Sequence, residues 1–242
     1  STAPVPAVTS AALTNDTTPI ISGTVESGAT VTLTVGGATY TSVASGGTWS
    51  VDLGTATPSS GTLGLNTNGA NAVSATVFDI AGNASMPSSQ TLLISTVAPT
   101  IPVITSAILT RDTTPEIAGT APAGSTVTVS VGGATYTTIA AGGIWSVDLG
   151  TAPSSGTLSL NTNGANLVSV TATDAVGNVS APRSQTVTID ALAPPAPAIT
   201  SAAATSDTTP EIAGTAEAGA TVTVSVGGAT YVTVATGGGW SI

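Results

Sequence analysis

The sequence repeats itself, and the length of the repeat limits the possible folds more than any other feature. The tetrapeptide Asp-Thr-Thr-Pro occurs at residues 16–19, 112–115 and 207–210, so the step is 96 and then 95 residues. One Tyr and one Trp follow each copy at a fixed distance: Tyr40, Tyr136 and Tyr231, then Trp49, Trp145 and Trp240. A β-solenoid needs a repeat of roughly 20–30 residues, so the sequence predicts a domain-sized module copied in tandem.

Proline-rich connectors separate the copies, at residues 3–6, 97–102 and 193–197. Proline restricts its own backbone and that of its neighbour, so we expect short, stiff spacers. The predicted modules are residues 1–96, residues 97–191 and residues 192–242. The third is an N-terminal half, because nothing in it corresponds to residues 157–190 of the second. We therefore expect the sequence to be an excerpt of a longer repetitive protein.

The composition excludes several classes of function. Charged residues make up 6% of the chain, the formal net charge is −10, and the only cations are Arg111 and Arg183. Such a chain cannot neutralise the phosphates of a nucleic acid or make a polybasic membrane contact. There is no Cys and no His, which excludes thiol and imidazole catalysis, disulfides and Cys/His zinc sites. No apolar run is long enough to span a bilayer. We predict that the chain is not an enzyme.

Alternating apolar and polar residues predict short strands. The cleanest is 30–35, which Gly36 and Gly37 should connect to 38–41 in a tight hairpin. We also expect strands at 7–13, from Pro19 onward, at 48–53, around Leu63 and Leu65, and in a final pair at 73–79 and 90–95. The residues predicted to face the core are Ile21, Val25, Trp49, Val51 and Leu53 in the first module, and Val168, Val170, Ala172, Val187 and Ile189 in the second.

These seven or eight strands, with no helical period and with turns at close intervals, predict an all-β chain of antiparallel two-sheet sandwiches. Each Trp is the largest apolar side chain of its module and should anchor the core. The orientation of each Tyr stays open. Asp52 and Asp148 fall on the outward face of the Trp strand, where we expect solvated charges. The outward Thr rows (Thr126 and Thr128, Thr221 and Thr223) are expected to be ordinary exposed strand residues.

Four segments of the second module resemble bacterial immunoglobulin-like domains, the tandem repeats of large surface adhesins and biofilm-associated proteins exported by type I secretion. They are 112–120 (DTTPEIAGT), 123–129 (AGSTVTV), 145–147 (WSV) and 173–178 (TDAVGN). The resemblance covers essentially the whole chain. It implies tandem immunoglobulin-like sandwiches in an elongated head-to-tail array, in a protein that is secreted or held at the bacterial cell surface.

The resemblance also implies calcium between neighbouring modules. An acidic residue of the kind often found at such joints is present at the second joint as Asp190, whereas the first joint has Ser95 in its place. In a head-to-tail array the Asp-Thr-Thr-Pro turn of one module should face the Asp-x-x-Gly-Asn loop of the next. Asp16 would then meet Asp174, while Asp112 and Asp190 would meet the corresponding loop of the third module. Calcium binds such oxygen ligands. The alternative is that these Asp residues only cap turns.

Two functions remain open. The first is a structural stalk or spacer of a bacterial adhesin or extracellular filament, which supports adhesion or biofilm formation and contacts neighbouring modules and other copies. The second is a module that binds glycans or surfaces many times over by avidity. An exposed face lined by Tyr40, Tyr136 and Tyr231 would favour the second. The half-module leaves strand edges open, and we expect continuation of the chain, rather than strands from another copy, to cover them.

Overall fold

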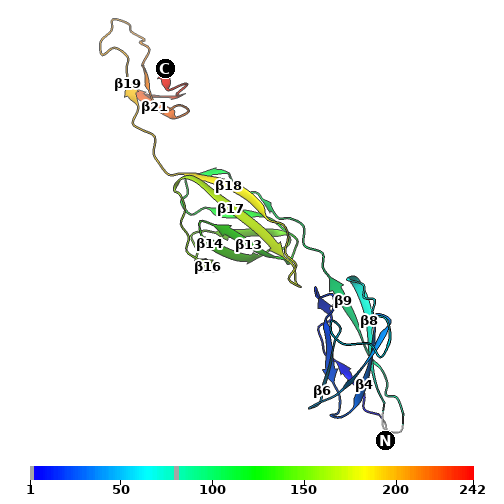
Figure 1. Ribbon diagram of the computed structural model, residues 1–242. Coiled ribbons are helices and arrows are strands. Elements are labelled where there is room, and N and C mark those ends of the chain that lie inside the picture. The colour runs from blue at the N-terminus through cyan, green and yellow to red at the C-terminus, as the bar shows by residue number, and fades with distance from the viewer. Residues whose placement is uncertain (1–2, 79–81) are drawn as a thin grey trace. The chain divides into compact units, whose positions relative to one another are not determined.

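Every regular element is a β-strand in the computed structural model, which describes residues 3–78 and 82–242 (Figure 1). The strands fall into three consecutive groups, and no sheet takes strands from two groups. The described residues contain no helix that could cross a membrane. The predicted all-β fold of sandwich-like modules in series is therefore confirmed. The sheets lie inside the three predicted module ranges, whose end points stay a prediction.

The first group forms two sheets. Its strands are β1 (Ala7–Val8), β2 (Leu13–Thr14), β3 (Ile20–Thr24), β4 (Thr30–Val35), β5 (Ala38–Val43), β6 (Thr48–Asp52), β7 (Ser60–Gly61), β8 (Asn68–Phe78) and β9 (Ser88–Ser95). One sheet has the order β1-β3-β6 and the other β2-β9-β8-β4-β5-β7. The last two strands are longer than predicted, and Asp79, the predicted end of β8, lies outside the described residues.

The first strand was predicted as one element and is in fact two. Its first part, β1, pairs antiparallel with β3, whereas its second part, β2, pairs parallel with β9 in the other sheet. The switch occurs where Thr9 and Ser10 both donate their backbone N–H groups to the carbonyl of Ser22, at 2.8 and 3.1 Å. Two donors on one acceptor interrupt the ladder, as in a β-bulge, and release the chain to the second sheet.

The strand predicted around Leu63 and Leu65 is also wrong. The strand in this region is β7, in which Gly61 is the register partner of Ala38. Both leucines are only partly buried and pack against the core from an irregular segment. The backbone N–H of Gly64 donates to the carbonyl of Gly36 at 2.8 Å, so this segment is tied to the hairpin turn and not to a strand.

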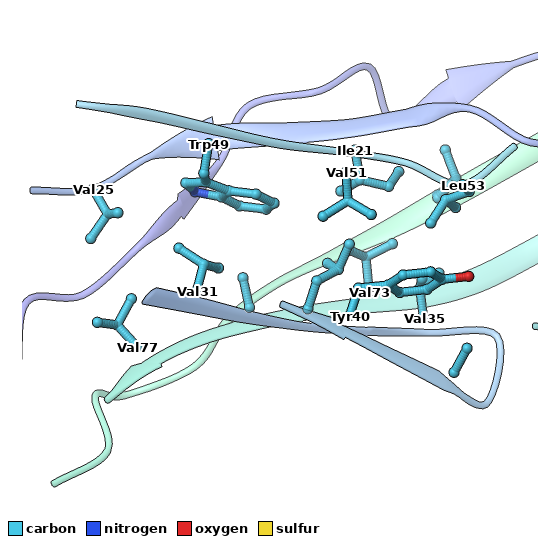
Figure 2. Close-up of a cluster of buried hydrophobic side chains, with 14 of the residues drawn as sticks. Ile21, Val25, Val31, Val35, Tyr40, Trp49, Val51, Leu53, Val73 and Val77 are labelled. Atoms are coloured by element: carbon cyan, nitrogen blue, oxygen red, sulfur yellow. The ribbon is translucent and has the colours of Figure 1, made fainter. Parts of the chain in front are cut away.

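The core lies between the two sheets, and Figure 2 shows side chains from both meeting there. Trp49, Val51 and Leu53 have exposed fractions of 2, 5 and 4%. They face side chains of the larger sheet that include Val31, Val35, Tyr40, Val73 and Val77. The predicted inward positions, Ile21 and Val25 included, are all buried. The tight Gly36-Gly37 hairpin is also confirmed, with φ of +55° and +80° at the two glycines, the signature of a type I′ turn.

Each Trp ring lies against a glycine of the neighbouring strand. A Cβ built on Gly23 would be 2.7 Å from two ring carbons of Trp49 and would also overlap the carbonyl oxygen of Ala7. Gly119 and Gly214 have the same relation to Trp145 and Trp240. The repeat therefore requires glycine at this position, because the indole and the adjacent strand β1, or its counterpart, fill the space of a side chain.

The second group repeats the first. Its strands are β10 (Val103–Ile104), β11 (Leu109–Thr110), β12 (Glu116–Thr120), β13 (Thr126–Val131), β14 (Ala134–Ile139), β15 (Ile144–Asp148), β16 (Ser155–Gly156), β17 (Asn163–Thr173) and β18 (Arg183–Asp190). The sheets have the orders β10-β12-β15 and β11-β18-β17-β13-β14-β16. The predicted inward residues Val168, Val170, Ala172, Val187 and Ile189 are at most 2% exposed.

The third group holds only part of this plan. Its strands are β19 (Ala198–Ile199), β20 (Ala213–Thr215), β21 (Thr221–Val226), β22 (Ala229–Val234) and β23 (Gly239–Ser241). They form one sheet of order β19-β20-β23 and a two-stranded sheet of β21 and β22. A small core of Val222, Val224, Ala235 and Trp240 lies between them. Residues 192–242 thus supply the counterparts of β10 and of β12–β15.

Candidate functional site

The Asp-Thr-Thr-Pro turn is held by its own acidic side chain. The backbone N–H of Thr18 donates to Oδ1 of Asp16 at 2.9 Å, and the N–H of Asp16 donates to Oγ1 of Thr14 at 3.0 Å. Asp207 makes the same two contacts in the third copy, with Thr209 and Thr205. This is the Asx-turn geometry that Asp favours. Turn capping is therefore confirmed as one role of Asp16 and its repeat partner.

Asp174 organises the loop that follows β17. Its Oδ1 accepts the backbone N–H groups of Val176 at 3.0 Å and Asn178 at 2.8 Å, and its Oδ2 accepts the side-chain amide of Asn178 at 2.8 Å. Burial of the carboxyl raises its pKa. The hydrogen bonds from the side chain and backbone of Asn178, and from the N–H groups of Val176 and Gly177, outweigh that effect and leave the pKa below the ordinary value.

Asp112 and Asp190 lie at exposed positions of the second module. The N–H of Asp112 donates to Oγ1 of Thr110 at 3.0 Å, which repeats the turn of the first module. Asp190 ends β18, and its Oδ1 accepts the N–H of Leu192 at 3.3 Å. Asp112 thus lies in the turn between β11 and β12, and the carboxylate of Asp190 is bonded to the turn that follows β18.

The donor set of these turns suits calcium only in part. Calcium takes six to eight oxygen ligands, whereas both carboxylate oxygens of Asp174 already accept N–H groups. Within residues 3–78 and 82–242, no group of three or more Asp, Glu, His or Cys side chains could hold a metal ion. A site between modules would therefore need backbone and amide oxygens as well. The pairing of Asp16 with Asp174, and of Asp112 and Asp190 with the loop of the third module, stays a prediction.

A buried asparagine that the sequence analysis did not single out fixes the long loop before β8. Oδ1 of Asn71 accepts the N–H of Asn66 at 2.7 Å, and its side-chain amide donates to the carbonyls of Asn66 and Gly69 at 2.9 and 3.3 Å. Asn166 makes the matching pair of bonds with Asn161 in the second module, at 2.8 and 2.9 Å. The signal in the sequence was the identical spacing of these Asn residues in both copies.

A second asparagine ties down the exit of each complete module. Oδ1 of Asn68 accepts both the N–H and the hydroxyl of Thr96, each at 2.9 Å. In the second module Oδ1 of Asn163 accepts the N–H of Ala191 at 3.2 Å. The residue that leads from the last strand into the proline connector is therefore attached to the sandwich. This attachment extends the rigid part of the module toward the joint.

The Tyr residues do not form an exposed binding face on the complete modules. Tyr40 and Tyr136 are 2 and 3% exposed, and the hydroxyl of Tyr136 donates to the carbonyl of Leu149 at 3.2 Å. Trp49 and Trp145 are equally buried. The feature that would have favoured glycan binding by avidity is thus missing from both complete modules.

Two surface depressions of these modules hold little chemistry. One beside Trp49 is lined largely by hydroxyl side chains, among them Thr9, Ser22 and Ser50, and contains no titratable group. Another, in the second module, holds Asp148 as its single carboxylate. In the first module the equivalent Asp52 caps the turn after its strand, accepting the N–H of Gly54 and the hydroxyl of Thr55, each at 2.9 Å. Neither depression brings together an acid and a base.

Two facing β-sheets of this strand order, repeated along the chain, define the immunoglobulin-like class of sandwich. Residues 104–191 match the family model of the bacterial Ig-like domain. Domains of this family are typical of surface proteins and are generally non-catalytic. No curated protein matches the chain.

Solved structures that are similar to the chain include three that match at low sequence identity. The fibronectin(III)-like modules of CbhA from Clostridium thermocellum match at 15% identity, over 74% of this chain and 87% of that one, with a TM-score of 0.41. The FN1–FN3 domains of chicken CNTN1 match at 8% identity, over 100 and 88%, with a TM-score of 0.29. The D1–D4 ectodomain fragment of ICAM-5 matches at 15% identity, over 98 and 74%, with a TM-score of 0.34.

Proposed function

We propose that this chain is a spacer: a run of stalk modules in a secreted or surface-attached bacterial adhesin or extracellular filament that supports adhesion or biofilm formation. The observation that carries the proposal is the parallel pairing of β2 with β9, and of β11 with β18. Because the first and last strands run in the same direction, the chain leaves each sandwich at the end opposite to where it enters.

This connectivity makes every complete module contribute its length to the distance between its two connectors. A last strand of eight residues, such as β9 or β18, spans roughly 27 Å at about 3.4 Å per residue. Each module closes its own core around its own Trp, so a copy can be added without a new contact elsewhere. Proline connectors and the tied exits at Thr96 and Ala191 favour an elongated head-to-tail array over a flexible chain.

Small-angle scattering of the full chain tests the spacer. A compact globule of 242 residues has a radius of gyration of about 18 Å. An elongated array should give a value far above that, and deletion of residues 97–191 should shorten the maximum dimension by at least the roughly 27 Å of one strand. A radius near that of the globule, or a deletion that leaves the maximum dimension unchanged, would contradict the proposal.

We further propose that calcium stiffens the joints, with Asp16 and Asp174 at the first, and Asp112 and Asp190 at the second. The chain has only two cations to balance its acidic residues, so carboxylates brought together at a joint would repel without a divalent ion. A divalent cation reverses the sign of that interaction and would hold the two turns together.

Calcium titration of the full chain, followed by scattering and thermal melting, tests this second proposal. Binding to the folded form alone should raise the melting temperature with calcium concentration. Asp16→Asn should abolish the response of the first joint, whereas Asp52→Asn, which alters a turn cap inside a module, should leave it intact. If excess calcium changes neither the melting temperature nor the dimensions of the chain, the proposal that calcium stiffens the joints is wrong.

A further inference from the structure

Charged residues avoid the larger sheet of both complete modules. In the described part of the first module, its strands β2, β9, β8, β4, β5 and β7 contain no Asp, Glu, Lys or Arg. Among the strands of the second module's larger sheet, the charged residues are Arg183 and Asp190, at the two ends of β18. The smaller sheets instead carry Asp52, Glu116 and Asp148. The outward face of the larger sheet, here called the broad face, is thus almost free of charge.

Hydroxyl side chains form the centre of the broad face in both modules. The central cross-strand rows consist of Thr41, Thr32 and Thr76 in the first module, and of Thr137, Thr128 and Thr171 in the second. Aliphatic side chains take equivalent places around them: Val43 and Ile139 are 64 and 57% exposed, and Leu13 and Leu109 are exposed on the edge strands β2 and β11. Such a surface can be covered without leaving a charge unpaired, because hydroxyls both donate and accept hydrogen bonds.

The distribution of charge indicates which partner the broad face fits. The chain has a formal net charge of −10, so two copies repel each other, and like charges brought into contact cost several kcal/mol. Contact through the broad faces avoids that cost, because Asp52 and Asp148 lie on the other sheet of their sandwiches. Hydroxyls can also pair with the hydroxyls of an identical face. Use of one patch by both partners is the usual arrangement in a two-fold symmetric dimer.

The size of the broad face sets the expected strength of such a contact. Five of its strands at about 4.8 Å spacing, each about 20 Å long as for the six residues of β4, cover roughly 480 Å². Two paired faces therefore bury roughly 1,000 Å², the lower limit for a specific interface, and one pair of modules should associate weakly and reversibly. A chain with several modules can make the contact more than once, which strengthens the association.

We propose that the broad face is a self-association surface, which pairs with the broad face of a second copy of this chain. The proposal deepens the spacer function and rests on it for the repetition of modules, since stalks that pair side by side would build a filament or matrix. Salt should strengthen the pairing, because it screens the repulsion between the acidic residues elsewhere on the two copies while the uncharged faces lose nothing.

Sedimentation velocity of the full chain over a range of concentrations tests the association. We expect a reversible equilibrium between monomer and dimer, with a larger dimer fraction at high salt. A chain that stays monomeric at roughly 1 mM, whatever the salt concentration, would overturn the proposal. So would a dimer that dissociates as salt is raised, because such a dimer would be held by charged groups.

Charges placed on the broad face test where the contact lies. Thr32→Glu with Thr128→Glu puts one carboxylate at the centre of each broad face, where it would meet the same carboxylate of the partner. The affinity of the dimer should fall by roughly tenfold or more. Ser50→Glu with Ser146→Glu is the matched control, since it adds the same two charges at exposed positions of the smaller sheets. Equal effects of the two pairs of changes would overturn the assignment.

A mixing experiment separates lost contact from lost folding. Thr32→Arg with Thr128→Arg should also be monomeric by itself, because equal charges meet again. An equimolar mixture with the glutamate variant should form a mixed dimer, because opposite charges then face each other across the contact. If both variants melt like the original chain and stay apart on mixing, the pairing of broad face with broad face is wrong.

A neutral glycan is the other occupant that an uncharged hydroxyl surface could take. If the chain stays monomeric but is retained on a neutral dextran matrix, and Thr32→Glu with Thr128→Glu abolishes the retention, the self-association proposal is overturned. The spacer is tested separately by scattering at concentrations where the chain is monomeric. An elongated chain that never associates would keep the spacer and overturn this proposal, whereas a compact chain that dimerises through the broad face would do the reverse.

Discussion

Replacing Gly23 by Ala is a stringent test of how the core is built. A Cβ at this position would lie 2.7 Å from the Cε2 and Cζ2 atoms of Trp49 and would overlap the carbonyl oxygen of Ala7. Neither neighbour can move freely. The indole is 2% exposed, and Ala7 belongs to β1, whose register partner is Thr24 of β3. The added methyl group must therefore displace either the ring or a strand.

The magnitude follows from two opposing effects. Overpacking a tight core costs about 1–3 kcal/mol, and the upper part of that range applies here because one of the overlapping atoms belongs to the backbone. Alanine is favoured over glycine within a strand by roughly 0.5–1 kcal/mol, which offsets part of the cost. The expected net destabilisation of the first module is about 2 kcal/mol, or roughly a 30-fold change in its unfolding equilibrium.

Native-state hydrogen exchange measures this change one module at a time. The amides of β8 should exchange roughly 30-fold faster in Gly23→Ala, whereas those of β17 should be unaffected. Gly64→Ala is the matched control, since the nearest atom to its added Cβ is the carbonyl oxygen of Gly36 at 3.8 Å. If the two variants exchange alike, the indole does not occupy the space assigned to it and the account of the repeated glycine is wrong.

Three further changes probe the second module, each measured by chemical denaturation or by exchange of the β17 amides. Asn166→Ala should cost about 1–3 kcal/mol, because the N–H and carbonyl of Asn161 lose their buried partner, while Asn163→Ala should cost less because its acceptor is exposed. The pKa of Asp174 is lowered in the folded module. Its contribution to the free energy of unfolding is therefore fully present above the ordinary pKa of about 3.9 and is lost as the pH falls through the lower folded pKa. Asp174→Asn should remove that acid dependence, and an unchanged pH profile would refute it. Glu116→Ile should stabilise the module by about 0.2–1 kcal/mol, since Glu116 lies directly opposite Asp148; high salt should shrink the gain, and a salt-independent gain would point to another cause.

Much of the fold could be predicted because alternation reports directly on burial. Val168, Val170 and Ala172 were assigned inward from their period of two, and all three are buried. The same rule failed at Leu63 and Leu65, where a bond from Gly64 to a distant turn replaces strand pairing. The alternation of residues also did not predict that the first strand is divided into β1 and β2. That division depends on the N–H groups of Thr9 and Ser10, which both donate to the carbonyl of Ser22 in another strand. Contacts between residues far apart in sequence leave no local period.

The candidate site was predictable only at the level of single turns. The Asp of Asp-Thr-Thr-Pro can be predicted to cap a turn, because its short side chain accepts hydrogen bonds from nearby backbone N–H groups. The bond from the N–H of Thr18 to Oδ1 of Asp16 is such a cap. Burial of Asn71 could not be read from a loop composition that usually marks exposed residues. The orientation of Tyr136 depends on a bond from its hydroxyl to the carbonyl of Leu149, thirteen residues away. The carboxylates that meet at a joint could not be predicted in the same way, because their pairing depends on the packing of two modules.

The parallel pairing of first and last strands has a mechanical consequence. Tension applied to the two connectors of a module pulls β2 and β9 along their lengths in opposite directions, so their hydrogen bonds are sheared together and do not open one after another. Two ties reinforce this pair, the backbone bond from Leu93 to Ala12 at 2.7 Å and the side-chain bond from Gln90 to Ser10 at 2.9 Å. The same glutamine recurs as Gln185, bonded to Ser106. A chain of these modules under tension would therefore resist extension at the same place in each complete repeat.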